Sequence, residues 1–213
     1  MFSLDIVTHY DKLIDDNNDP FRDPQSLRKY MDKWDGQVFI DSMCLTRTKR
    51  VLEIGIGTGR IAAKVAPLCL KLLGIDISPK TIERAKENLS DFNNIKLICA
   101  NFQDYIFDET FDVIYSSLTM MHFENKQQII LKVNELLNKN GVFCLSIDKS
   151  SSDYIDMRDY KLRIFPDNLD DITKYINLTD MDIINQFETD FAYVFICLKQ
   201  TNSNLQGNGF KLS

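Results

Sequence analysis

Three glycines and one acid stand close together in residues 51–59, which read Val-Leu-Glu-Ile-Gly-Ile-Gly-Thr-Gly. Gly55, Gly57 and Gly59 allow a sharp backbone turn and the close approach of a ligand to bare main chain. An apolar strand precedes this loop and helix-forming residues follow it. A strand, a glycine turn and a helix start together predict a nucleotide-binding corner of an α/β sheet.

The spacing of these glycines argues against a dinucleotide ligand. The dinucleotide pattern G-x-G-x-x-G, counted from Gly55, needs a glycine at the position that Arg60 occupies. Glu53 would repel a diphosphate, whereas it would attract a cationic amino group. The chain also has no Tyr-x-x-x-Lys pair. An NAD-dependent enzyme on the same fold therefore stays an alternative and not the favoured hypothesis.

Polar residues also follow the next predicted strands, at the sheet edge where ligands bind in such folds. The strand 72–76 ends in Asp76, which lies 21 positions after Gly55, close to the spacing of a ribose-binding acid. Ser78 and a following proline predict the start of the next helix. Later strands end beside Asn101 and Phe102, and at Ser117 ahead of Leu118–Phe123.

This arrangement resembles the class I S-adenosylmethionine-dependent methyltransferases of the small-molecule type, over about residues 50–150. The resemblance implies S-adenosylmethionine as the cofactor, bound by the glycine loop with Glu53, and Asp76 on the ribose hydroxyls. Ile77 follows Asp76 and is expected at the same site. Asn101 and Phe102 match the adenine position, although the family usually has Asp where this chain has Asn. An Asn can still accept a hydrogen bond from the adenine amino group.

Five further residues are candidates for the site. His122 is the candidate general base, because its ordinary pKa is near neutral, and the alternative is a hydrogen-bonding role in the pocket wall. Tyr10 is a candidate to cover the adenosine or face the sulfonium. Arg28 is a candidate to clamp the methionine carboxylate, against an exposed helix arginine. Ser117 completes the cofactor-binding set, and Asp148 is a candidate to orient an amine or hydroxyl substrate.

The predicted fold is a Rossmann-like, doubly wound, seven-stranded mixed sheet whose last strand is antiparallel, with a helical N-terminal cap. Asp182–Glu188 and Phe191–Lys199 are separated by two residues, which predicts an antiparallel hairpin. We expect residues 1–45 to form the cap, with one long helix over Gln25–Met43. Residues 46–199 should form the methyltransferase domain, and residues 200–213 a flexible tail.

Composition limits the partners. The 213 residues carry a net charge of −6, so the bulk surface does not suit nucleic acid. No apolar run approaches about 18 residues and no basic leader precedes an apolar one, which predicts a cytoplasmic protein without membrane contact. Five cysteines without a C-x-x-C pair predict no metal site. His9 is expected at the surface, and the chain is expected to be a monomer or homodimer.

The favoured function is transfer of a methyl group to an O, N or S atom of a small-molecule acceptor, by in-line displacement. The reaction needs an aligned nucleophile and the exclusion of water. An S-adenosylmethionine-binding protein without transferase activity is the second hypothesis.

Overall fold

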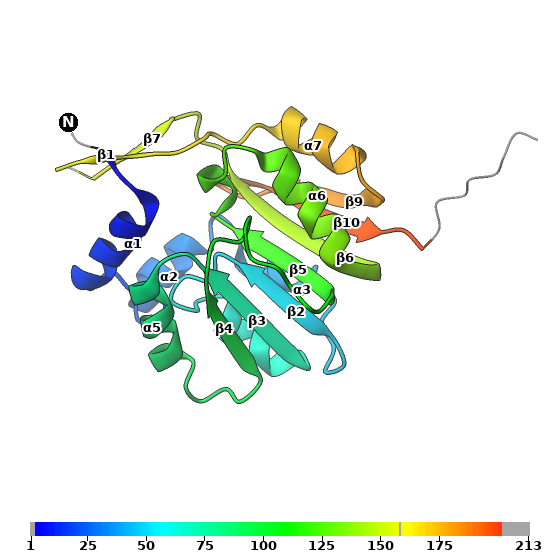
Figure 1. The fold of residues 1–213 in the computed structure, drawn as a ribbon, viewed down its shortest axis with the longest axis horizontal. Helices are drawn as coiled ribbons and strands as arrows, with labels where there is room; N and C mark the ends of the chain where they lie inside the picture. The colour runs from blue at the N-terminus through cyan, green and yellow to red at the C-terminus, as the bar shows by residue number, and fades with distance from the viewer. Residues whose placement is uncertain (1–2, 158, 202–213) are drawn as a thin grey trace, which may run out of the picture.

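A seven-stranded sheet forms the centre of the molecule (Figure 1). The computed structural model describes residues 3–157 and 159–201. The sheet order is β4-β3-β2-β5-β6-β10-β9. Strand β10 runs antiparallel to β6 and β9, and the other neighbours are parallel, which confirms the predicted mixed sheet. The strands are β2 (Arg50–Ile54), β3 (Lys71–Asp76), β4 (Ile95–Cys99), β5 (Phe111–Ser117), β6 (Leu137–Asp148), β9 (Met181–Glu188) and β10 (Ala192–Lys199).

Two layers of helices cover the two faces of the sheet, because successive strand residues point to opposite sides. Leu52 and Ile54 of β2 pack in one core with residues of α6 and α7. Val51 packs in a second core with residues of α3, α4 and α5. The α-helices are α1 (Ile6–Asp15), α2 (Gln25–Met31), α3 (Gly36–Asp41), α4 (Ala62–Val65), α5 (Pro79–Asn88), α6 (Lys126–Leu136) and α7 (Leu169–Asn177), with 3-10 turns at Ala66–Leu68 and Met120–His122.

Local signals place several element ends correctly. Ser78 caps α5, its Oγ accepting a hydrogen bond from the backbone N–H of Thr81 at 3.0 Å, and Pro79 takes the first helical position. The predicted hairpin is confirmed, since β9 and β10 pair antiparallel from Tyr193 with Glu188 onward. These features depend on a cap and a short turn, which neighbouring residues determine.

The N-terminal segment corrects the prediction of one helix over Gln25–Met43, since α2 ends at Met31 and α3 begins at Gly36. The break turns the buried Asp35 toward Arg60, whose guanidinium donates to both carboxylate oxygens at 3.0 and 2.5 Å. Gly36 has a φ of +74°, which favours glycine. A contact made across the fold therefore outweighs the helical pattern here.

A small three-stranded sheet, in the order β1-β8-β7, lies at one end of the molecule (Figure 1). Its strands are β1 (Ser3–Leu4), β7 (Tyr154–Asp156) and β8 (Lys161–Arg163). Phe39, Ile40 and Met43 are buried with the central sheet, so residues before position 46 supply part of its core. Of the tail expected over 200–213, residues 202–213 lie outside the described part.

No helix in residues 3–157 and 159–201 is long and apolar enough to cross a membrane. The same residues bring together no group of three or more His, Cys, Asp or Glu side chains suited to a metal ion.

Candidate functional site

A cavity of about 340 Å³ opens at the carboxyl ends of the central parallel strands, where ligands bind in α/β sheets of this kind. The glycine loop after β2, the ends of β3 and β5, and the residues after β4 form its floor. The N-terminal segment contributes Ile6, Tyr10, Pro20 and Met31. The predicted site residues that line this cavity are Tyr10, Glu53, Gly55, Gly57, Asp76, Ile77, Asn101, Phe102, Ser117 and His122.

The three loop glycines have different roles. All have positive φ, at +75° for Gly55, +55° for Gly57 and +96° for Gly59. A Cβ on Gly55 would lie 2.1 Å from Oγ1 of Thr119, and one on Gly59 would lie 2.7 Å from the Leu89 side chain. A Cβ on Gly57 would meet no atom of the described residues within 4 Å. Gly59 therefore serves packing against the end of α5 and does not line the cavity, whereas Gly57 leaves open space beside it.

Asp76 lies at the end of β3 with its carboxylate already positioned by backbone donors. The N–H of Gly57 donates to Oδ2 at 3.0 Å, and the N–H of Ser78 donates to Oδ1 at 3.0 Å. Burial raises the pKa of this carboxyl, while the backbone donors oppose that shift. Each oxygen keeps a further lone pair for a ligand hydroxyl.

Glu53 is buried on the floor of the cavity, in β2. Its Oε2 accepts a hydrogen bond from the hydroxyl of Tyr115 at 2.7 Å. Burial raises the pKa of Glu53 to about 8, although the Tyr115 hydroxyl and the charge of Arg60 oppose the rise. A cationic group in the cavity would favour the ionised form, so this acid suits an amino group.

Arg60 joins the cavity wall to the N-terminal segment. Besides its paired contact with Asp35, its Nη1 lies 3.5 Å from Asp32. Ser117 also donates to Asp35, at 2.8 Å. The residue that replaces the third glycine of the dinucleotide pattern thus binds the loop before α3, and Ser117 connects the same loop to the end of β5.

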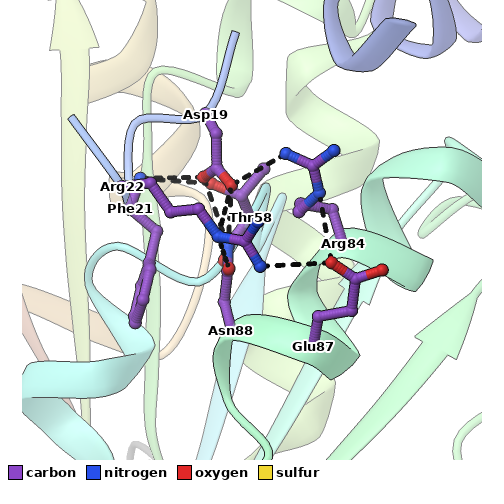
Figure 2. Close-up of polar contacts among 7 residues, drawn as sticks. All are labelled: Asp19, Phe21, Arg22, Thr58, Arg84, Glu87 and Asn88. Atoms are coloured by element: carbon purple, nitrogen blue, oxygen red, sulfur yellow. Dashed lines mark hydrogen bonds and ion pairs between the residues drawn. The ribbon is translucent and has the colours of Figure 1, made fainter. Parts of the chain in front are cut away.

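A second polar cluster holds the N-terminal segment on the glycine loop, and Asp19 is at its centre (Figure 2). Asp19 is 3% exposed and accepts hydrogen bonds from Arg84 at 3.2 Å and from Asn88 at 3.1 and 3.2 Å. The backbone N–H of Phe21 contacts both Asp19, at 3.1 Å, and Oγ1 of Thr58, at 3.4 Å. Pro20, next to Asp19, lines the cavity. This cluster therefore fixes the part of the N-terminal segment that covers the cavity, which we call its roof, to α5.

Tyr10 and His122 contact each other in the wall of the cavity. The Tyr10 hydroxyl lies 2.7 Å from Nε2 of His122, and no hydrogen bond to the buried Nδ1 is found among the described residues. Burial lowers the pKa of His122 to about 4, so the imidazole is neutral at pH 7. Burial also raises the pKa of Tyr10.

The other predicted residues divide between the cavity and the surface. Ile77 and Phe102 give the cavity apolar walls, and Oδ1 of Asn101 accepts a hydrogen bond from the N–H of Gln103 at 3.0 Å. Arg28 lies on the exposed side of α2 and does not line the cavity. The surface position expected for His9 is wrong, because His9 is 2% exposed and its Nδ1 lies 3.0 Å from the Tyr160 hydroxyl.

A second cavity, of about 360 Å³, adjoins the first. Tyr10 and Leu118 line both cavities. Asp148, at the end of β6, and Asp167, just before α7, bring two carboxyl groups to the second one. Its other lining residues are Met121, Ser150, Tyr154, Ile155, Ile164 and Pro166.

Sequence reasoning missed Asp19, Asp35 and Asp167 as parts of these sites. Asp19 precedes Pro20, and an acid at such a position is a candidate to cap or anchor a loop. For Asp35 the available signal was Gly36, which follows it inside a helical pattern. Asp167 follows a proline in an irregular segment, and nothing local points to its burial.

The family model described as "Methyltransferase domain" matches residues 52–145. Malonyl-[acyl-carrier protein] O-methyltransferase 1 of Ilyobacter polytropus is 27% identical over 133 residues, which are 62% of this chain and 49% of that protein. Ribosomal protein L11 methyltransferase of Clostridium botulinum is 35% identical over 103 residues, 45% of this chain and 30% of that protein. The chain therefore spans about half or less of the length of these relatives.

A solved structure supports the same fold. N-methyltransferase NodS from Bradyrhizobium japonicum, in complex with S-adenosyl-L-homocysteine, superposes with a TM-score of 0.70 at 15% identity. The superposition covers 91% of this chain and 97% of that one. At this level of identity the likeness shows the fold.

Proposed function

We propose that this chain is a class I S-adenosylmethionine-dependent methyltransferase, and that it transfers a methyl group from that cofactor to an O, N or S atom of a small molecule. One observation carries the proposal. Gly57 leaves open space in a cavity that has a buried acid, Glu53, and a second acid, Asp76, already oriented by backbone donors. This pair of acids suits a ligand that carries both an amino group and a diol, and it does not suit a diphosphate.

The residues present fit this cofactor. Asp76 would accept hydrogen bonds from the ribose hydroxyls with the lone pairs that Gly57 and Ser78 leave free. Glu53 would face the amino group of the methionine part, whose charge stabilises the ionised carboxyl. Ile77 and Phe102 would contact the adenine, and Asn101 would accept a hydrogen bond from its amino group.

The sulfonium of the bound cofactor supplies an activated methyl group, so the chain's residues mainly position the acceptor and exclude water. Tyr10 and Leu118 stand between the two cavities, and the acceptor's lone pair would approach there, opposite the sulfur. His122 is the candidate base for an acceptor that must lose a proton. Its neutral form is available at pH 7, and a pKa of about 4 makes it a weak base.

The net charge of −6 and the acid-lined second cavity favour a small molecule over a nucleic acid as the acceptor. One relative is a ribosomal protein L11 methyltransferase, so the acceptor screen should contain peptides as well as small molecules.

Isothermal titration calorimetry tests the cofactor assignment. We expect S-adenosylmethionine and S-adenosylhomocysteine to bind and NAD to fail. Asp76→Ala should weaken both by about tenfold or more, because it removes a charged acceptor of hydroxyl hydrogen bonds. Binding of NAD alone, or unchanged affinity in the variant, would overturn the assignment. Release of S-adenosylhomocysteine in an acceptor screen separates an active enzyme from a protein that only binds the cofactor.

A further inference from the structure

We propose that the second cavity binds the acceptor through a cationic amine, and that Asp167 and Asp148 select it. This inference rests on the proposed methyl transfer. The second cavity adjoins the cofactor cavity at Tyr10 and Leu118, so a molecule bound there would lie next to the cofactor. It concerns recognition of the acceptor, and product analysis would identify the methylated atom.

Asp167 is the main reason for expecting a cation. Its side chain is 1% exposed, and it lines the cavity. One oxygen, Oδ1, forms an ion pair with Nζ of Lys126 at 3.0 Å. No hydrogen bond of ordinary geometry to the other oxygen, Oδ2, is found among the described residues, although the backbone N–H of Asp148 lies near this carboxyl. A buried carboxylate oxygen without a donor carries a substantial energetic cost, which a ligand ammonium would remove.

Lys126 only partly compensates the charge of Asp167. Its Nζ also donates to the backbone carbonyls of Met120, Phe123 and Phe165, at 2.9, 3.1 and 2.8 Å. An ammonium has three protons, and these carbonyls together with Asp167 make four acceptors. Lys126 does not itself line the second cavity.

Asp148 adds a second acid in a fixed orientation. Its Oδ2 accepts a hydrogen bond from Nε1 of Trp34 at 2.7 Å, and its Oδ1 accepts one from the N–H of Ser150 at 2.5 Å. Both donors are neutral, so they leave the charge of Asp148 uncompensated. None of the described residues that line this cavity is Lys, Arg or His. The cavity therefore combines two acids with no lining cation.

The rest of the lining indicates the body of the acceptor. Leu118, Met121, Ile155 and Ile164 are apolar, and Tyr154 adds an aromatic ring. Both carboxylates would repel an anion, and a neutral molecule would leave the charge on Oδ2 of Asp167 without a cationic partner. An amine on an apolar skeleton satisfies both parts of the lining.

The test uses the full chain saturated with S-adenosylhomocysteine, which cannot donate a methyl group. Phenethylamine and hexylamine are compared with their alcohol isosteres, 2-phenylethanol and hexanol, by calorimetry. We expect each amine to bind at least about tenfold more tightly than its alcohol. Asp167→Asn and Asp148→Asn should each reduce this ratio markedly, whereas the exposed Asp153→Asn should preserve it.

Two variants are needed because Asp167→Asn removes the partner of the buried Lys126 and can lower stability. S-adenosylhomocysteine affinity, measured on every variant, reports whether the fold is intact. If the chain binds S-adenosylhomocysteine but prefers no amine, or if the preference survives in both variants, the inference is overturned and the proposed function stands. If S-adenosylhomocysteine does not bind while the amine preference is present, the cofactor assignment fails and the amine site is supported.

Discussion

The Tyr10 hydroxyl and Nε2 of His122 lie 2.7 Å apart across 112 positions of the chain. This contact joins α1 to the turn after β5, at the boundary between the two cavities. His122, in the turn that follows strand β5 of the central sheet, thus holds Tyr10 in place. The N-terminal segment and the sheet are coupled where the acceptor would meet the methyl group.

Tyr10→Phe should keep the ring and remove this hydrogen bond. We expect turnover to fall about fivefold while S-adenosylhomocysteine affinity falls less, because a net hydrogen bond contributes about 1 kcal/mol and the ring still covers the cavity. Steady-state kinetics and calorimetry measure the two effects. Tyr160→Phe is the matched control, since it removes the corresponding contact to His9 outside the cofactor cavity. Equal losses in both variants would argue against a specific role for Tyr10.

Glu53 makes the stability of the cofactor-free protein depend on pH. Its pKa rises from 4.5 to about 8 in the fold, chiefly because of burial. A carboxyl with a raised pKa stabilises the fold fully below its unfolded value, and this contribution is lost as the pH rises toward the folded value. The free energy of unfolding of the wild type should therefore fall by about 5 kcal/mol in total as the pH rises from below 4.5 to above 8.

Glu53→Gln should show a flatter dependence over this pH range, because an amide does not titrate and its carbonyl can still accept from Tyr115. Urea unfolding at several pH values measures the effect, and the exposed Glu124→Gln serves as the control. Parallel curves for Glu53→Gln and the wild type would contradict the assignment.

Gly57→Ala and Gly59→Ala should have different consequences. At Gly59 the new Cβ would lie 2.7 Å from Leu89, so we expect a loss of stability of about 2 kcal/mol or more. At Gly57 the Cβ meets no atom of the described part of the chain, and the positive φ costs about 1 kcal/mol. The Gly57 variant should instead lose cofactor affinity. Thermal unfolding and calorimetry on both variants check this, and a folded Gly57→Ala protein with full affinity would place the cofactor elsewhere.

Asp19→Ala should destabilise the roof of the cofactor cavity. The substitution leaves Arg84 and Asn88 without their buried acceptor, which we expect to cost about 3 kcal/mol. Cofactor affinity should fall as well, because Pro20 lines the cavity beside this cluster. Urea unfolding and calorimetry measure both effects. Asp23→Ala is a suitable control four positions away, and an effect as large at Asp23 would contradict the role given to Asp19.

Much of the fold and of the cofactor cavity could be predicted because local backbone geometry creates it. Neighbouring residues determine the glycine loop, the cap at Ser78 and the two-residue hairpin. Asp76 was predictable from its spacing of 21 positions after Gly55. The positions of these residues at the carboxyl edge then follow from parallel strand order.

The missed features depend on contacts that are distant in the chain. Asp35 breaks a helical pattern because Arg60 binds it, and His9 is buried because Tyr160 covers it. The second cavity needs the small sheet, whose strands are too short to give a periodic signal. For Arg28 the residue type suits a carboxylate ligand, but the side chain lies on an exposed face of α2 and does not line the cavity. The sequence alone does not indicate which face of this helix points toward the cavity.

The pairing of β1 with β8 also has a consequence for how the protein forms. Ser3 pairs with Lys161 and Leu4 with Leu162, so the first described residues have no partner until most of the chain has been synthesised. Closing so long a loop is entropically slow compared with forming neighbouring strands. We therefore expect the parallel strands β2, β3, β4, β5 and β6 to pair before α1, with Tyr10, docks. Competence for methyl transfer would then be acquired only after these strands have formed.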